Sequence, residues 1–89
     1  MRFAWDQAKA DANARKHGVT FEEAATVFLD PLALIVEDPG HPENARIIGQ
    51  SVSQRILLVV FVEPAEDGLR LISARRATRH ERRRYEECE

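Results

Sequence analysis

The sequence has few residues of several types, and each shortage argues against a class of protein. Cys88 is the only cysteine, so no intramolecular disulfide can form, and no Cys or His spacing indicates a zinc site. The longest apolar run, residues 56–62, is too short to cross a bilayer as a helix and predicts a buried strand. Residues 1–6 lack the apolar core of a signal peptide. We therefore expect a cytoplasmic protein in which residues 1–89 form a single domain.

The charge is unevenly distributed, although the net charge is only −2. Residues 69–84 contain seven arginines against one acidic residue, Glu81, so this segment carries +6 and the rest of the chain −8. Such a split indicates a basic face that meets a polyanion, and the planar guanidinium group matches phosphate. A solvated helix end covered by acidic neighbours is an equally good explanation of the charge alone. The seven residues are Arg70, Arg75, Arg76, Arg79, Arg82, Arg83 and Arg84.

Hydrophobic periodicity and capping residues predict an α+β fold with the order β-α-α-β-β-β-β-α. A short strand around Phe3 and Trp5 precedes a helix over residues 7–17, which Asp6 caps and Gly18 ends. A capping box of Thr and Glu at positions 20 and 23 then starts a second helix, which an Asp-Pro pair stops at positions 30 and 31.

Four strands are predicted for the remainder, over residues 32–37, 46–51, 55–63 and 69–74. In the last of them, simple alternation places Leu69, Leu71 and Ser73 on one face and Arg70, Ile72 and Ala74 on the other. A second capping box, Thr78 with Glu81, starts a final helix that runs to about Glu87. Short turns between the strands favour an antiparallel sheet with the helices packed on it.

Motifs at both ends of the chain resemble those of the BrnT toxins, and the match covers nearly the whole chain in order and spacing. The N-terminal half contains Phe3-x-Trp5-Asp6, Lys9, Asn13-x-x-Lys16-His17-Gly18-Val19, Phe21-Glu22-Glu23-Ala24 and Phe28-x-Asp30-Pro31. The remainder contains Arg46-x-x-Gly49, Ile72-Ser73-Ala74-Arg75-Arg76-Ala77-Thr78, Glu81-Arg82 and Tyr85.

The resemblance implies a compact RelE-like antiparallel sheet with helices. It also implies a ribonuclease toxin of a type II toxin-antitoxin system, which cleaves RNA and thereby arrests translation. The implied partner is a BrnA-like antitoxin with a ribbon-helix-helix DNA-binding domain. The complex would repress its own operon, so that the toxin meets operator DNA only through the antitoxin. No membrane partner is expected.

One position departs from the family pattern. Its members usually have Thr-Glu-Arg at the end of the central apolar strand, where this chain has Val62-Glu63-Pro64. The missing Arg would be a candidate phosphate ligand. The alternative interpretation is therefore a catalytically weak or inactive module that binds the antitoxin and acts mainly in operon autoregulation.

RNA cleavage needs a base for the 2′-OH, cations for the charged phosphorane and an acid for the leaving oxygen. The sequence shows no acidic cluster suited to two metal ions, so we expect a metal-independent endoribonuclease with no cofactor. Arg75 and Arg76 leave the last strand just before a helix N-terminus, a favourable place for phosphate. Glu63 could act as the base, could orient Arg75, or could be an exposed ion-pair partner. The predicted catalytic residues are Glu63, Arg75 and Arg76.

The predicted RNA-binding residues each have a structural alternative. His17 could act as an acid or a base, but it also suits the end of a helix. Tyr85 could stack on a base, donate a proton or pack in the core. Lys9 and Arg46 could follow the RNA backbone or be ordinary surface charges. Direct DNA reading by the final helix is disfavoured, because no aromatic or amide side chains for base contacts accompany its arginines. The set is Lys9, His17, Arg46, Arg79, Arg82 and Tyr85.

Overall fold

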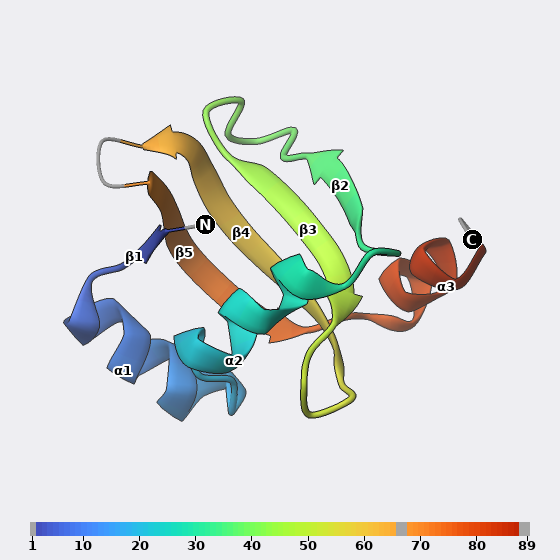
Figure 1. Ribbon diagram of the computed structural model, residues 1–89, viewed down its shortest axis with the longest axis horizontal. Coiled ribbons are helices and arrows are strands. Elements are labelled where there is room, and N and C mark those ends of the chain that lie inside the picture. Colours follow the sequence, from blue (N-terminus) through green and yellow to red (C-terminus); the bar gives the residue numbers. More distant parts are fainter. Residues whose placement is uncertain (1, 66–67, 88–89) are drawn as a thin grey trace.

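The computed structural model describes residues 2–65 and 68–87, and Cys88 lies outside these residues (Figure 1). Its elements are β1 (Phe3–Ala4), α1 (Gln7–His17), α2 (Phe21–Thr26), the 3₁₀ helix η1 (Val27–Leu29), β2 (Leu34–Glu37), β3 (Ala45–Gln50), β4 (Ile56–Ala65), β5 (Gly68–Arg76) and α3 (Arg79–Glu87). The predicted element order is confirmed. No helix within the described ranges is long and apolar enough to span a membrane.

The helix boundaries are set by the capping residues that the sequence indicates. Asp6 caps α1, because its carboxylate accepts a hydrogen bond of 3.1 Å from the backbone N–H of Lys9. Gly18 ends α1 in the left-handed region at φ 68°, and its N–H donates to the carbonyl of Ala14. The hydroxyl of Thr20 accepts a bond of 3.1 Å from the N–H of Glu23 and so starts α2.

The five strands form one mixed sheet in the order β1-β5-β4-β3-β2. Strands β2 to β5 pair antiparallel with their neighbours along the chain, as the short turns predict. Strand β1 lies outside the four strands for which the turns predict antiparallel pairing, and it pairs parallel with β5 through Phe3 and Leu69, so the sheet as a whole is mixed. The turn argument does not apply to β1, because two helices and three strands separate it from β5 in the sequence.

The two faces of the sheet are covered unequally. Helices α1, α2 and η1 lie over the face seen in Figure 1, where Phe21 and Val27 pack on Leu57, Val59 and Phe61. On the other face, a smaller cluster joins Ile48 and Leu58 to Tyr85 of α3. We call this second face the open face, because among the described helices only α3 packs on it, at one end.

A β-bulge in β5 determines which side chains reach the open face. Val60 pairs with Ser73 while Phe61 pairs with Leu71, so Ile72 is an extra residue without a partner of its own. After the bulge, odd-numbered residues of β5 point to the open face and even-numbered ones to the helix-covered face, the reverse of the order before it. Ala74 is therefore buried together with Leu69 and Leu71, and the simple alternation predicted for this strand is wrong. Arg75, two residues after Ser73, lies on the open face.

Candidate nucleic-acid interface

Arg75 stands near the end of β5, where an ion pair with α3 fixes its guanidinium group. Its Nη1 and Nη2 donate to Oε1 and Oε2 of Glu81 at 2.8 and 2.9 Å, the parallel two-bond geometry of a guanidinium and a carboxylate. Nη1 also donates to the carbonyl of Arg76 at 3.2 Å. The Arg75 side chain remains 34% exposed, so a ligand can still reach it.

Glu81 joins Arg75 of β5 to Thr78 and to the start of α3. Its carboxylate accepts a bond of 2.9 Å from the N–H of Thr78, and its own N–H donates to the Thr78 hydroxyl at 3.2 Å, which confirms the capping box. The hydrogen bond from Arg75, supported by those from Thr78, lowers the pKa of Glu81 from 4.5 to about 2, although burial opposes the shift. The same pair raises the pKa of Arg75. A carboxylate thus stands where the sequence predicted a phosphate, between a guanidinium group and a helix N-terminus.

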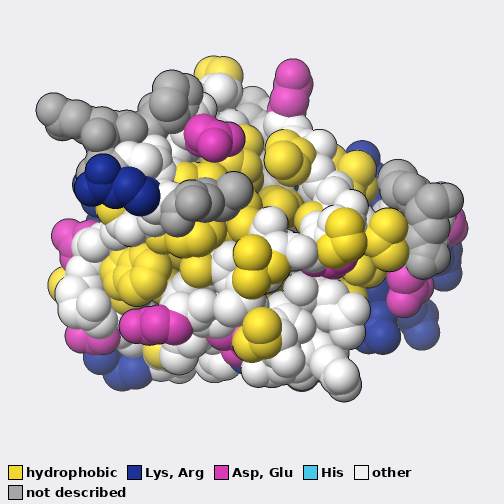
Figure 2. Space-filling view, viewed as in Figure 1, with side chains coloured by type: hydrophobic (Ala, Val, Ile, Leu, Met, Phe, Trp, Pro, Cys, Tyr) yellow, Lys and Arg dark blue, Asp and Glu magenta, His cyan; other side chains and the backbone are white. Residues whose placement is uncertain are grey.

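Three arginines of α3 gather around a polar hollow of about 490 Å³. Arg82 and Arg83 follow Arg79 by three and four residues, which places the three side chains on one side of the helix. Arg82 pairs with Glu86 at 3.3 Å, but both side chains are more than half exposed, so this pair binds weakly. The remaining positive charge is available to a polyanion, and Figure 2 shows basic side chains gathered at the α3 end of the molecule. We call the hollow the arginine groove; it is lined by Ala77, Arg79, Arg82, Arg83 and Glu86.

The structure does not bring the three predicted catalytic residues together. Arg75 pairs with Leu58 and Arg76 with Leu57, so the two arginines face opposite sides of the sheet. Glu63 is five residues beyond Leu58 on β4, which at ~3.3 Å per residue places it about 17 Å away along the strand. The suggestion that Glu63 orients Arg75 is therefore wrong, because antiparallel pairing puts these residues at opposite ends of the hairpin. Glu81 occupies that role.

Of the predicted RNA-binding residues, Arg79 and Arg82 share the arginine groove, and Arg46 lies on the open face, where it pairs with Asp38 at 3.2 Å. Lys9 and His17 belong to α1, which covers the opposite face of the sheet.

Tyr85 is buried, and its hydroxyl donates to Asp30 at 2.6 Å. A buried ring offers no face on which a base could stack, so the stacking role predicted for Tyr85 is wrong and the core-packing alternative is confirmed.

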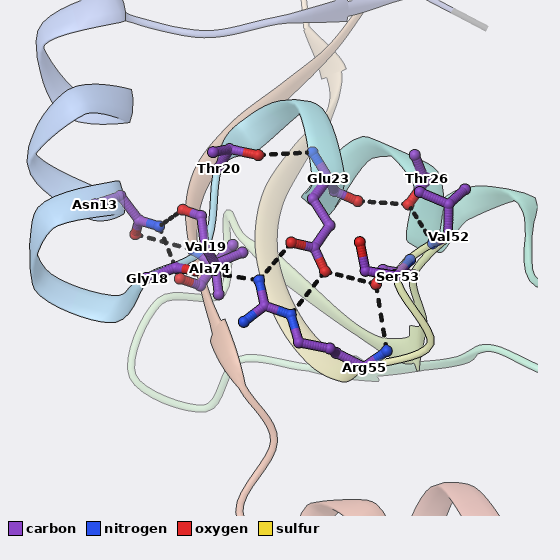
Figure 3. A network of polar contacts seen from close by, with 11 residues as sticks. Asn13, Gly18, Val19, Thr20, Glu23, Thr26, Val52, Ser53, Arg55 and Ala74 are labelled. Carbon is purple, nitrogen blue, oxygen red and sulfur yellow. Dashed lines mark hydrogen bonds and ion pairs between the residues drawn. The ribbon is translucent and has the colours of Figure 1, made fainter.

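A polar network on the helix side engages the carboxylate of Glu23, which the sequence assigned to a capping box with Thr20 (Figure 3). Among the described residues, only the Thr20 hydroxyl makes its predicted capping bond, and the Glu23 carboxylate binds Arg55 and Ser51. Glu23 of α2 accepts two hydrogen bonds from Arg55 and one of 2.6 Å from the Ser51 hydroxyl. The bonds from Arg55 keep the pKa of Glu23 below its usual value, and the positive charge of Arg76 adds to the effect. Arg55 also donates to the carbonyl of Gly18 at 3.1 Å. The network therefore ties α1 and α2 to the turn between β3 and β4.

Asn13 joins α1 to β5 in the same region. Its buried amide donates to the carbonyls of Val19 and Ala74 at 3.0 and 2.8 Å and accepts from the N–H of Ala74 at 3.1 Å. The motif around Asn13 signals that the residue matters, but nothing in the sequence names partners sixty-one residues away.

A family model for the ribonuclease toxin BrnT of type II toxin-antitoxin systems matches residues 5–81. The chain belongs to this family. The 1.1 Å crystal structure of the Brucella abortus ribonuclease toxin BrnT shares the fold, with a TM-score of 0.71 and 25% sequence identity over 89% of this chain and 99% of the Brucella chain. No curated protein matches the chain. The chain is therefore a ribonuclease toxin of the BrnT family, and its type II system includes an antitoxin partner.

Proposed function

We propose that this BrnT-family toxin cleaves RNA without a metal ion and that Arg75 is the cation that stabilises the transition state. The ribose 2′-oxygen would form a bond to the adjacent phosphorus while the bond to the 5′-oxygen of the next nucleotide breaks. The proton of the 2′-OH passes to solvent, and the leaving oxygen takes one from water. The products are a 2′,3′-cyclic phosphate and a 5′-hydroxyl end.

The single observation that supports this role is the fixed position of Arg75. The bulge at Ile72 turns Arg75 to the open face, and two hydrogen bonds to Glu81 hold its guanidinium group while a third of the side chain stays accessible. A preorganised cation stabilises developing charge more effectively than a mobile one, because little reorganisation is needed during the reaction. Glu81 is then a positioning residue rather than a catalytic one.

The phosphates that flank the cleaved bond would bind to the arginine groove. Arg79, Arg82 and Arg83 supply three guanidinium groups against the carboxylate of Glu86. Arg46 adds a further cation on the open face, although Asp38 partly neutralises it. Binding through phosphate contacts releases counterions, so RNA affinity should fall steeply as the salt concentration rises.

The partner in this proposal is a BrnA-like antitoxin with a ribbon-helix-helix domain. The complex would repress its own operon, with operator DNA contacted through the antitoxin. The toxin would act in the cytoplasm, where it meets messenger RNA and arrests translation.

Two observations favour a second candidate function, that of a weak or inactive module that binds antitoxin and serves autoregulation. The resemblance leads us to expect an Arg at position 64, where this chain has Pro64. The carboxylate of Glu81 also binds the guanidinium group of Arg75 and so competes with a phosphate for it. However, Pro64 lies towards the β4–β5 turn, at the opposite end of the hairpin from Arg75. The proposed mechanism therefore does not need an arginine at position 64.

Induced expression in a bacterial host separates the two functions. Wild-type chain should arrest growth, and co-expressed antitoxin or Arg75→Ala should relieve the arrest. Arg15→Ala is the matched control, because it removes the same charge from an exposed position on α1 and should arrest growth like the wild type. Normal growth with soluble, folded wild-type protein would favour the inactive module, and arrest by Arg75→Ala would remove Arg75 from the mechanism.

A further inference from the structure

Four large hydrophobic side chains are more than half exposed within residues 2–65 and 68–87. Leu29 of η1 is 78% exposed, Leu32 in the next turn 52%, Ile35 of β2 62% and Val52 in the β3–β4 turn 70%. We call these four residues the apolar edge. Clustered exposed apolar side chains are typical of a protein interface, whereas scattered ones need no explanation.

The sheet register brings the four residues to one region. Strand β2 is the edge of the sheet, and it begins where β3 ends, because Leu34 pairs with Ile48. The β3–β4 turn that holds Val52 is therefore close to the start of β2. Ile35 pairs with Ile47, a residue of the helix-side core, so Ile35 faces the same side as η1. Figure 2 shows hydrophobic side chains at the surface of this helix-covered face.

A hollow of about 290 Å³ is lined by Leu29 and Val52 of the apolar edge and has fixed walls. The carboxylate of Asp30 accepts bonds of 2.9 and 2.8 Å from the N–H groups of Leu32 and Gln50, and the hydroxyl of Thr26 accepts one of 3.0 Å from the N–H of Val52. These bonds hold both loops in place, so the hollow is preformed for an apolar side chain of a partner. The lining residues are Thr26, Leu29, Asp30, Gln50, Ser51, Val52 and Gln54.

We infer that the antitoxin docks on the apolar edge and places a hydrophobic side chain in this hollow. Membership of a type II toxin family supplies the partner, so the inference rests on that membership and not on the position of RNA cleavage. The antitoxin would be held mainly by apolar burial on a surface separate from the open face.

The positive charge of α3 indicates which charged residues the antitoxin segment carries. Asp30 connects the hollow to α3, because its carboxylate accepts a hydrogen bond from the hydroxyl of Tyr85. Figure 2 shows basic side chains at the same end of the molecule as α3. Electrostatic complementarity therefore favours a segment in which acidic residues flank the apolar anchors and reach the arginine groove.

The double substitution Leu29→Ser with Val52→Ser tests the inference. Both side chains are exposed, so the fold should persist, and neither belongs to the proposed catalytic machinery. Purified antitoxin of the same operon is titrated calorimetrically into each toxin, and RNA cleavage is followed with and without the antitoxin. Ala12→Ser, an exposed substitution on α1, is the control.

The double variant should cleave RNA at the wild-type rate but bind the antitoxin at least about tenfold more weakly, because two apolar contacts are lost. Affinity within twofold of the wild type would overturn the inference. Sedimentation identifies the rival occupant: a wild-type dimer that the substitutions dissociate, with antitoxin affinity unchanged, would assign the apolar edge to a second copy of the chain. If the wild type does not cleave RNA but the double substitution still lowers antitoxin affinity, this inference is sustained while the ribonuclease mechanism is refuted.

Discussion

Replacing Glu81 with Gln should weaken the link between β5 and α3 without removing the helix cap. Glutamine at this position still serves a capping box, since its amide oxygen can accept from Thr78. The charge opposite Arg75 is lost, however, and with it the charge-assisted character of the hydrogen bonds at 2.8 and 2.9 Å. The variant therefore isolates the ion pair from the cap.

The expected magnitude follows from the pKa of Glu81. A decrease from 4.5 to about 2 corresponds to about 3.4 kcal/mol, at ~1.36 kcal/mol per pH unit. Solvent reaches Arg75, which is 34% exposed, and screening reduces this to roughly 1–2 kcal/mol. Because folding lowers this pKa, the stabilisation is complete above about pH 4.5 and disappears as the pH falls towards 2.

Urea unfolding at pH 7, 5 and 3 measures this dependence. At pH 7 and 5, Glu81→Gln should be less stable than the wild type by roughly 1–2 kcal/mol, and at pH 3 the difference should be smaller. Glu86→Gln is the control, because its pair with Arg82 is exposed and should contribute less than about 0.5 kcal/mol. A difference between wild type and Glu81→Gln that stays constant with pH, or one no larger than the control gives, would show that the ion pair of Glu81 with Arg75 does not stabilise the fold.

Three further substitutions probe the frame around the site, each by thermal or urea unfolding. Asn13→Ala removes three buried hydrogen bonds and should cost about 2–3 kcal/mol, whereas a loss below about 0.5 kcal/mol would show that water replaces the amide. Gly49→Ala places a Cβ 2.9 Å from side-chain atoms of Ala33 and Val27, so it should lower the free energy of unfolding by about 1–3 kcal/mol. Unchanged stability would mean that η1 moves away from the new Cβ without a measurable energetic cost. Tyr85→Phe should cost about 1–1.5 kcal/mol and leave the RNA cleavage rate unchanged, and a much slower cleavage rate would restore a proton-donor role for the hydroxyl.

Local signals in the sequence predict most of the fold. The caps at Asp6, Gly18, Thr20 and Thr78 are formed by residues next to one another in the chain, so their geometry can be read from the sequence alone. Strand positions follow from apolar runs for the same reason. The parallel pairing of β1 with β5 cannot be predicted in this way, because it joins segments far apart in the sequence.

The candidate site was predicted only in part, and the bulge at Ile72 is the main reason. Both faces of β5 carry apolar residues, so alternation alone cannot reveal an extra residue, yet that residue decides which face Arg75 occupies. The partner of Arg75 is not predictable from the sequence, because the capping box already explains Glu81. The two roles coexist, since a carboxylate has lone pairs enough for both Thr78 and Arg75.

A single-turnover assay tests whether Arg75 stabilises the transition state of a metal-independent cleavage. Purified wild type, Arg75→Ala and Arg15→Ala would be incubated in excess with an RNA substrate and EDTA, and the cleaved ends analysed. We expect cleavage to 2′,3′-cyclic phosphate ends by the wild type and the control, and a rate about 10²–10³-fold lower for Arg75→Ala, as for the loss of one transition-state donor. Cleavage by Arg75→Ala at the wild-type rate would exclude Arg75 from transition-state stabilisation, and wild-type activity that EDTA abolishes would exclude a metal-independent reaction.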